Sequence, residues 1–265
     1  MPDVVTTEIR GNVALLTLNR PERSNAMIPP MLEAFETICA DLARKGEVRA
    51  LVVTGAGKAF CSGGDVQAWE SGGGPREREA SGSRRDVVDV PTRVILPFRQ
   101  FPGPVIAAIN GVAAGAGLGL ALAADLRIAS TEARLGSLFV KRGIAPGNGI
   151  SWNLPRIVGT AKALEIMLTG DWVSPQEAER IGLVNKVVAP EQLLPTALEW
   201  ANKIAANPPI AVELTKKAVW RGMESDLLPH LEQEHYYQQI TFASEDFKES
   251  VKSFLEKREP RYRGR

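Results

Sequence analysis

The stretch NGVAAGAGLGLALAADLRIAS, residues 110–130, decides the fold class of this chain. It follows an apolar run, Val105 to Ile109, that is typical of a buried strand. The stretch opens with a turn rich in Gly and Ala, continues as a helix near residues 115–124 and ends in another strand at residues 126–129. A strand, a glycine-rich turn, a helix and a further strand in this order predict a parallel α/β core.

The same unit occurs once before. The apolar run ALVVTG, residues 50–55, leads into the loop GAGKAFCSGGD and a helix that begins at Asp65. A helix start presents unpaired N–H groups and the positive end of the helix dipole, and small residues let a ligand approach that backbone closely. Two such turns side by side predict an oxyanion hole. The alternative is that the small residues serve only tight packing of helix on strand, and neither turn carries a phosphate-binding fingerprint.

The remaining pattern divides the chain into two regions. The core, residues 1–191, also holds a predicted strand pair joined at Gly11 and Asn12, and a polar, glycine-rich surface loop at residues 71–85. From about Gln192 the pattern is helical, so residues 192–265 are predicted to form a helical region packed on the core or on another subunit. Further helices are predicted at residues 30–45 and 86–99.

Composition excludes several classes of function. The chain has 265 residues, of which 44% are hydrophobic and 24% charged, as is ordinary for a soluble globular protein. A net charge of +1 gives no field for nucleic acid or an anionic membrane, and the apolar residues 104–124 are interrupted by Pro104, Asn110 and glycines. Two cysteines, Cys39 and Cys61, make neither a disulfide framework nor a zinc site. We therefore expect a cytoplasmic protein without a metal.

In its motifs the chain resembles the crotonase superfamily, the enoyl-CoA hydratase/isomerase proteins. The resemblance implies an α/β crotonase (ClpP-like) fold, a repeated ββα superhelical core with a C-terminal helical region, assembled as a homotrimer or a homohexamer. It also implies an acyl-CoA substrate, with coenzyme A bound as part of the substrate and no permanently bound cofactor. The matching stretches are LTLNRPERSNAM, LVVTGAGKAFCSGGDV, PVIAAINGVAAGAGLGLALAADLRIAS, GIAPGNGISWNLPRIVG, ALEIMLTGDWVSPQEAERIGLVNKVV and SEDFKESVKSFLEKREPRYRG.

Matching these motifs residue by residue places the two oxyanion-hole amides at Gly64 and Ala116. Because the backbone donates, Ala in place of the usual Gly at position 116 need not harm the hole. The two glutamates that serve hydratases of the family as acid and base match Gly119 and Phe139 here. The acidic position of some isomerases of the family matches Gly147. None of these three side chains can transfer a proton.

The expected function follows from the presence of the two oxyanion-hole amides and the absence of the acid–base residues. General acid–base catalysis contributes about 10²–10⁴-fold, so efficient hydration by the usual route is not expected. We expect an enzyme of the hydratase/isomerase type, a lyase or isomerase, whose oxyanion hole stabilises an enolate or a tetrahedral oxyanion. The alternatives are a catalytically impaired CoA-thioester-binding protein, and a CoA-thioester hydrolase or decarboxylase.

The resemblance also indicates binding residues. Asn148 and Trp152 match positions that line the substrate pocket, although Asn148 could instead cap a helix and Trp152 could be core. Asp65 could supply an acid, but an N-cap is its usual role at such a site. For coenzyme A the matching residues are Arg23 and Ala26 near the nucleotide, and Phe254 and Lys257 near the adenine and phosphates, often across a subunit boundary.

Other reactive residues have ordinary structural explanations. Cys61 lies close to the proposed hole, but no histidine is near it in sequence to activate it. Cys61 is therefore predicted to be a small buried residue and not a nucleophile. His230 and His235 are five residues apart and do not share a helix face, which disfavours a metal site. His230 is spaced to pair with Glu234. Asp125 is predicted to anchor a turn.

Overall fold

The computed structural model describes residues 3–67, 93 and 95–265. The loop predicted at residues 71–85 lies outside these residues, as does most of the helix predicted at 86–99. Residues 95–100, which are described, are helical.

A six-stranded sheet forms the centre of the fold, in the order β1-β2-β3-β5-β7-β9. β1 and β2 form the predicted antiparallel pair, and the other neighbours are parallel. The apolar runs of β3 and β5 are wholly buried, which suits strands covered on both faces. The strands are β1 (Val5–Arg10), β2 (Val13–Leu18), β3 (Ala50–Gly55), β5 (Val105–Ile109), β7 (Leu126–Ser130) and β9 (Lys186–Val188).

A second, three-stranded parallel sheet has the order β4-β6-β8 and contains β4 (Ala59–Cys61), β6 (Val112–Ala114) and β8 (Arg134–Gly136). Each of its strands directly follows one strand of the large sheet, so β3–β4, β5–β6 and β7–β8 are successive turns of one repeat. The β5–β6 turn is completed by α5 (Ala116–Ala123), a helix buried on all sides. This repeated ββα arrangement confirms the predicted fold.

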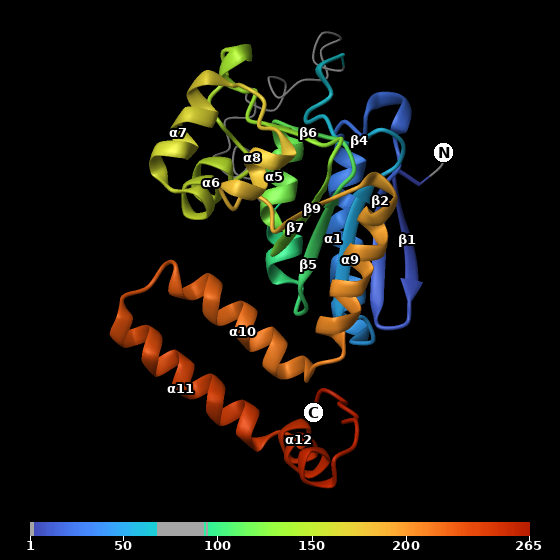
Figure 1. Cartoon of the computed structure of the whole chain (residues 1–265), viewed down its shortest axis with the longest axis vertical. Helices are drawn as coiled ribbons and strands as arrows, with labels where there is room; N and C mark the ends of the chain where they lie inside the picture. Colours follow the sequence, from blue (N-terminus) through green and yellow to red (C-terminus); the bar gives the residue numbers. More distant parts are fainter. Residues whose placement is uncertain (1–2, 68–92, 94) are drawn as a thin grey trace, which may run out of the picture.

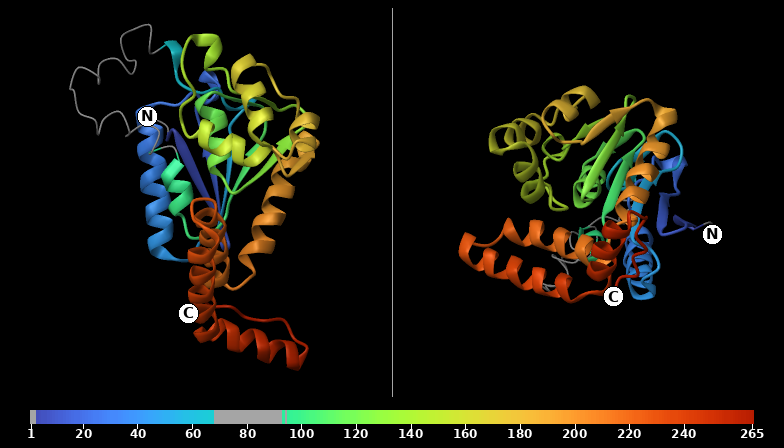
Figure 2. Two further views of the ribbon diagram at one scale, coloured as in Figure 1. Left: turned by 90° about the vertical axis from the view of Figure 1, so that its left-hand side faces the viewer. Right: turned by 60° about the horizontal axis from the view of Figure 1, so that its bottom comes forward.

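Helices cover both faces of the large sheet, as the two views of Figure 2 show. Along β2, Ala14 and Leu16 face the cluster that contains α1 (Pro29–Lys45), whereas Val13 and Leu15 face α9 (Pro190–Ala205). This alternation is the two-residue period of a strand buried on both sides. Around the small sheet lie η1 (Pro21–Arg23), η2 (Val140–Arg142), α6 (Ile150–Val158), α7 (Thr160–Thr169) and α8 (Pro175–Arg180).

The C-terminal region divides into two parts. α9 packs on the sheet through Leu193, Ala197, Ala201 and Ala205. α10 (Pro209–Gly222), α11 (Leu227–Ala243) and α12 (Glu245–Glu256) extend away from the two sheets (Figure 1). The predicted division into a core of residues 1–191 and a helical region of residues 192–265 stays a prediction. Among the described residues, no helix is both long and apolar enough to cross a membrane.

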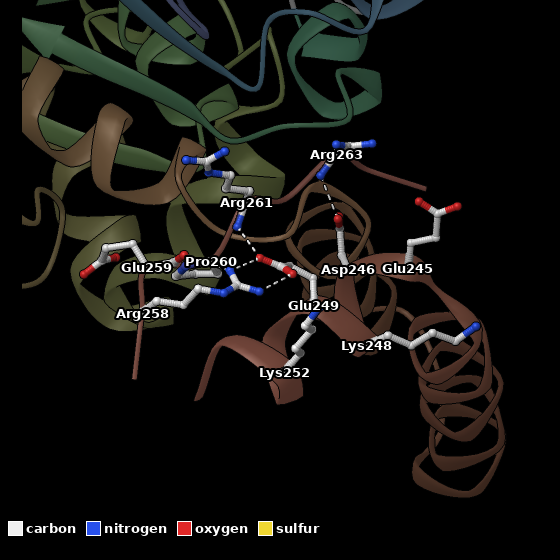
Figure 3. A pocket seen from close by; sticks show the side chains of 10 residues that line it. All are labelled: Glu245, Asp246, Lys248, Glu249, Lys252, Arg258, Glu259, Pro260, Arg261 and Arg263. Atoms are coloured by element: carbon white, nitrogen blue, oxygen red, sulfur yellow. Dashed lines mark hydrogen bonds and ion pairs between the residues drawn. The ribbon is translucent and has the colours of Figure 1, made fainter. Parts of the chain in front are cut away.

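The last residues of the chain fold back on α12 around a cavity of about 910 Å³ (Figure 3). The buried carboxylate of Asp246 accepts hydrogen bonds from the amides of Arg263 and Gly264. Glu249 binds the guanidinium of Arg258 and the amide of Arg261, and these contacts lower the pKa of Glu249 from its ordinary 4.5 to about 2.

This lowered pKa predicts that acid releases the tail. Because the pKa of Glu249 is lower in the folded chain, its contribution is complete above about pH 4.5 and disappears as the pH falls towards about 2. Hydrogen–deuterium exchange of a peptide covering residues 258–265, corrected for the intrinsic rate, should show protection falling across this range. Glu249→Gln should lower that protection at neutral pH and remove the pH dependence. Tail protection that stays constant in the unsubstituted chain would contradict the assignment.

Candidate active site

The two glycine-rich turns lie next to each other because β4 and β6 are neighbouring parallel strands. Cys61 of β4 is the register partner of Ala113 of β6. Gly64 follows the end of β4, and Ala116 follows the end of β6 as the first residue of α5. Both turns therefore leave the carboxyl edge of the same small sheet. Its strands β4 and β6 are labelled in the upper half of Figure 1.

Gly63 brings the two turns into contact. Its φ of +98° is rarely adopted by residues with a side chain, and a Cβ there would lie 2.7 Å from the carbonyl oxygen of Ala114 and 3.3 Å from the amide nitrogen of Ala116. Gly117 is equally restricted, since its Cβ would lie 2.0 Å from the carbonyl oxygen of Cys61. Glycine at these positions lets the backbone of the first turn lie directly against the start of α5.

The amides of Gly64 and Ala116 donate no hydrogen bond to any described residue. Amides beside them do: Met27 donates to the carbonyl of Gly63 at 2.7 Å, and Gly115 donates to that of Gly136 at 2.9 Å. Gly64 is half-buried and Ala116 is 9% exposed. Backbone donors left unpaired in such surroundings are rare, and here they suit an oxygen atom from a ligand.

The other two predicted positions, Phe139 and Gly147, have different surroundings. A Cβ at Gly115 would lie 3.9 Å from Cζ of Phe139, so the Phe139 ring stands beside the second turn. A Cβ at Gly147 would have no atom of the described residues within 4 Å. Nothing in the described part of the chain therefore obstructs a side chain at residue 147, whereas residue 139 supplies an apolar wall.

Gly119 is packed against Asn148. A Cβ at Gly119 would lie 2.7 Å from the carbonyl oxygen of Asn148 and 2.8 Å from its Cβ. The main chain of Asn148 thus occupies the space into which a side chain at residue 119 would extend.

This contact predicts that a glutamate cannot simply be placed at residue 119. Gly119→Glu should lower the free energy of unfolding by about 1–3 kcal/mol, since the backbone of Asn148 must move. Gly147→Glu is the matched control, because no described residue lies within 4 Å of a Cβ at residue 147, and it should change stability by less than about 0.5 kcal/mol. Urea denaturation measures both, and equal stabilities of the two variants would contradict the packing described.

The segment around Ala26 runs along the first turn. Ser62 donates to the carbonyl of Ser24 at 3.0 Å, and Met27 forms a bridge with Gly64. The carboxylate of Asp65 pairs with the guanidinium of Arg20 at 3.2 Å, and Arg20 also donates to the carbonyl of Ala26. Asp65 thus holds this segment in place.

The four residues predicted to contact coenzyme A are not brought together within one chain. Arg23 is exposed and Ala26 buried in the segment beside the first turn. Phe254 is 83% exposed on α12, and Lys257 follows at the end of that helix. Figures 1 and 2 show α12 at the far end of the molecule from the small sheet.

Trp152 packs against the C-terminal region. Its ring centroid lies 6.2 Å from that of Trp220 on α10, and the guanidinium of Arg156 lies over it at 4.1 Å. Arg99 lies over the Trp220 ring and donates to the side-chain oxygen of Asn153. Burial lowers the pKa of Arg99 to about 10.

Sequence reasoning missed the role of Asp125. Its carboxylate accepts hydrogen bonds from the amide of Val105, the indole of Trp220 and the ammonium of Lys216, each at 2.8 Å. Lys216 also donates to the carbonyls of Phe98 and Gly103, and burial lowers the pKa of this lysine. The only signal in the sequence is the i, i+4 spacing of Lys216 and Trp220 on one helix face.

The remaining reactive side chains are structural. Cys61 is fully buried, and burial raises the pKa of its thiol to about 12, which makes it a poor nucleophile. His230 lies 3.4 Å from Glu234, as its spacing predicted. In the described part of the chain, no three His, Cys, Asp or Glu side chains are grouped as metal ligands.

Comparison with known proteins matches residues 8–265 to the family model described as enoyl-CoA hydratase/isomerase. Short-chain-enoyl-CoA hydratase from Clostridium acetobutylicum is 38% identical over 96% of this chain and 95% of its own. 1,2-Epoxyphenylacetyl-CoA isomerase from Escherichia coli is 34% identical, with both chains covered in full. The crystal structure of enoyl-CoA hydratase from Bacillus anthracis superposes with a TM-score of 0.92 at 36% identity, over 99% of this chain and 100% of that one.

Proposed function

The chain belongs to the enoyl-CoA hydratase/isomerase family, and on that premise we propose that it activates acyl-CoA thioesters with the amides of Gly64 and Ala116. These amides point to one function because they have no hydrogen-bond partner among the described residues, stand on adjacent turns and belong to backbone that Gly63 holds in contact. Bound to the thioester oxygen, they would withdraw electrons from the carbonyl and acidify the α-carbon. Removal of one such donor typically costs about 2.7–4 kcal/mol of transition-state stabilisation.

The residues at positions 119 and 139 limit which reaction the oxyanion hole can support. Gly119 and Phe139 have no proton to give or take, and Phe139 places an apolar ring beside the second turn. The proposed chemistry is therefore stabilisation of an enolate whose α-proton passes to and from solvent water, since neither residue 119 nor residue 139 can accept it, with slow addition of water to the double bond. A hydrolase, a decarboxylase and an impaired binding protein gain no support from the relatives, which are named as hydratases and isomerases.

The coenzyme part of the substrate is proposed to bridge two copies of the chain. Arg23 and Ala26 lie beside the first turn of one copy. Phe254 and Lys257 would come from another copy, because α12 extends away from its own small sheet with Phe254 and Leu255 83% and 74% exposed. A homotrimer or homohexamer, as expected from the sequence, would provide this arrangement.

A panel of short 2-enoyl- and 3-enoyl-CoA thioesters tests the proposed function. Loss of the conjugated absorbance from a 2-enoyl-CoA reports hydration, which adds one water by mass spectrometry, and gain of that absorbance from a 3-enoyl-CoA reports isomerisation, which leaves the mass unchanged. We expect turnover in which isomerisation exceeds hydration. A chain that neither binds nor converts any acyl-CoA would refute the function, and hydration at an ordinary enzymatic rate would refute the role given to Gly119 and Phe139.

A further inference from the structure

The guanidinium of Arg20 lies beside the first glycine-rich turn and binds two segments at once. Its Nη1 donates to the carbonyl of Ala26 at 2.7 Å, and its Nη2 pairs with the carboxylate of Asp65 at 3.2 Å. The side chains of Arg20 and Asp65 are only 16% and 13% exposed. Arginine suits such a place, because its planar guanidinium always carries a charge and holds its donors in fixed directions.

Hydrogen bonds connect this guanidinium to the amide of Gly64. The carbonyl of Ala26, which accepts from Arg20, belongs to the same peptide group as the amide of Met27. That amide donates to the carbonyl of Gly63 at 2.7 Å, and this carbonyl belongs to the same peptide group as the amide of Gly64. Two peptide groups therefore lie in series between Nη1 of Arg20 and the amide proposed to hold the thioester oxygen.

This chain of hydrogen bonds fixes the direction of the last N–H. The described residues contain no cis peptide bond, and in a trans peptide group the C=O and N–H bonds point in opposite directions. The bond from Met27 to Gly63 therefore turns the N–H of Gly64 away from Met27. In the described part of the chain that N–H has no partner, which suits donation to a ligand.

The same chain carries the effect of the charge to that N–H. A hydrogen bond with a charged donor is roughly twice as strong as one between neutral groups, and successive hydrogen bonds polarise one another. Each donor draws electrons from the carbonyl that it binds and leaves the N–H of that peptide group more positive. The low exposure of Arg20 limits screening by water. The Gly64 amide should thus be a stronger donor than an ordinary backbone amide.

Asn25 fixes the start of this chain of hydrogen bonds. The amide of Arg20 donates to Oδ1 of Asn25 at 2.9 Å. Nδ2 of Asn25 donates to the carbonyls of Ala56 and Ala59, at 2.9 and 2.7 Å, and Asn25 is fully buried. Its side chain therefore joins the segment of Arg20 to the loop between β3 and β4, the strand that leads towards Gly64.

We infer that Arg20 is a positioning residue for the reaction, because it orients and polarises the Gly64 amide through the two peptide groups between them. This inference rests on the proposed function, since the Gly64 amide matters only if it binds the thioester oxygen. In this role Arg20 does not touch the substrate. It strengthens a hydrogen bond that grows as negative charge develops on that oxygen, so kcat should depend on Arg20 more than KM does.

Infrared spectra of ¹³C-carbonyl-labelled butyryl-CoA bound to the protein test this, together with kcat and KM for an enoyl-CoA that the chain converts. Arg20→Met removes the charge and the donors of the side chain. It should lower kcat about tenfold, which is less than loss of the donor itself, and leave KM within about twofold. The carbonyl band should move part of the way back towards its solution frequency. Arg20→Lys, which restores a charged donor, should recover part of both effects.

Arg10→Met is the matched control. Arg10 pairs with Glu8 on β1, where the two side chains are 44% and 58% exposed, so this variant should change neither kcat nor the carbonyl band. Circular dichroism reports whether Arg20→Met folds. If it does not fold, Arg20→Gln takes its place, because glutamine can donate to the carbonyl of Ala26 without a charge.

A carbonyl band and a kcat that are the same with and without the Arg20 guanidinium would overturn the inference. So would a lower kcat with an unchanged band, because a merely structural role of Arg20 predicts that result. Both outcomes leave the proposed function intact. A thioester that absorbs at its solution frequency when bound to the unsubstituted chain would instead refute the proposed function itself.

Discussion

Replacing Ala116 with proline should lower kcat/KM for an enoyl-CoA thioester by about 10²–10³-fold. The substitution removes the N–H proposed to hold the thioester oxygen and places a ring carbon on the same nitrogen. Proline suits the first position of a helix, which Ala116 occupies in α5. The preceding residue, Gly115, has φ 52° and ψ −122°, a conformation open to glycine and compatible with a following proline.

Ala116→Gly is the matched control, because it changes the side chain and keeps the amide. It should retain activity within a few-fold, and circular dichroism should show both variants folded. If the proline variant is folded and as active as the glycine variant, the Ala116 amide has no role in the reaction. A fall in both variants alike would assign the effect to packing of α5.

Lys216→Met should lower the free energy of unfolding by about 3–5 kcal/mol, because it leaves the carboxylate of Asp125 buried without its charged partner. Lys216 and Asp125 are 8% and 14% exposed in their side chains, and Lys216 makes further hydrogen bonds to two carbonyls. Together with the bond from Trp220 to Asp125, these contacts hold α10 on the core.

The next residue provides the control. Lys217 pairs with Glu213 on the exposed face of α10, so Lys217→Met should cost about 0–1 kcal/mol. Urea denaturation followed by tryptophan fluorescence measures both variants, and Trp220, one of the five tryptophans, lies at the contact between α10 and the core. Similar losses in the two variants would mean that the buried pair contributes no more than an exposed one.

The sequence predicts those parts of the fold that depend on short-range patterns. The strand, glycine turn and helix at residues 105–124 appear in the structure, as do the strand and turn at residues 50–65, and their order along the chain already implied a parallel core. The helix predicted from Asp65 lies mostly outside the described residues. The approach of the two turns follows from that topology, because the strands before them are neighbours.

Short-range sequence patterns do not predict contacts between segments that are distant in the chain. Asp125 and Trp220 are 95 residues apart in sequence, and nothing local to Asp125 indicates a partner on α10. The contact of Asn148 with Gly119 depends on the path of the loop after η2, including a left-handed residue, which propensity does not specify. Sequence reasoning could show that residue 119 lacks a carboxylate, but not what fills its place.

The carbonyl stretching frequency of a ¹³C-labelled acyl-CoA thioester bound to the protein tests the central claim most directly. Two hydrogen bonds from Gly64 and Ala116 would weaken the C=O bond, so the band should move to lower frequency on binding and return part of the way in Ala116→Pro. A bound thioester that absorbs at its solution frequency, or at the same frequency in both proteins, would contradict the account.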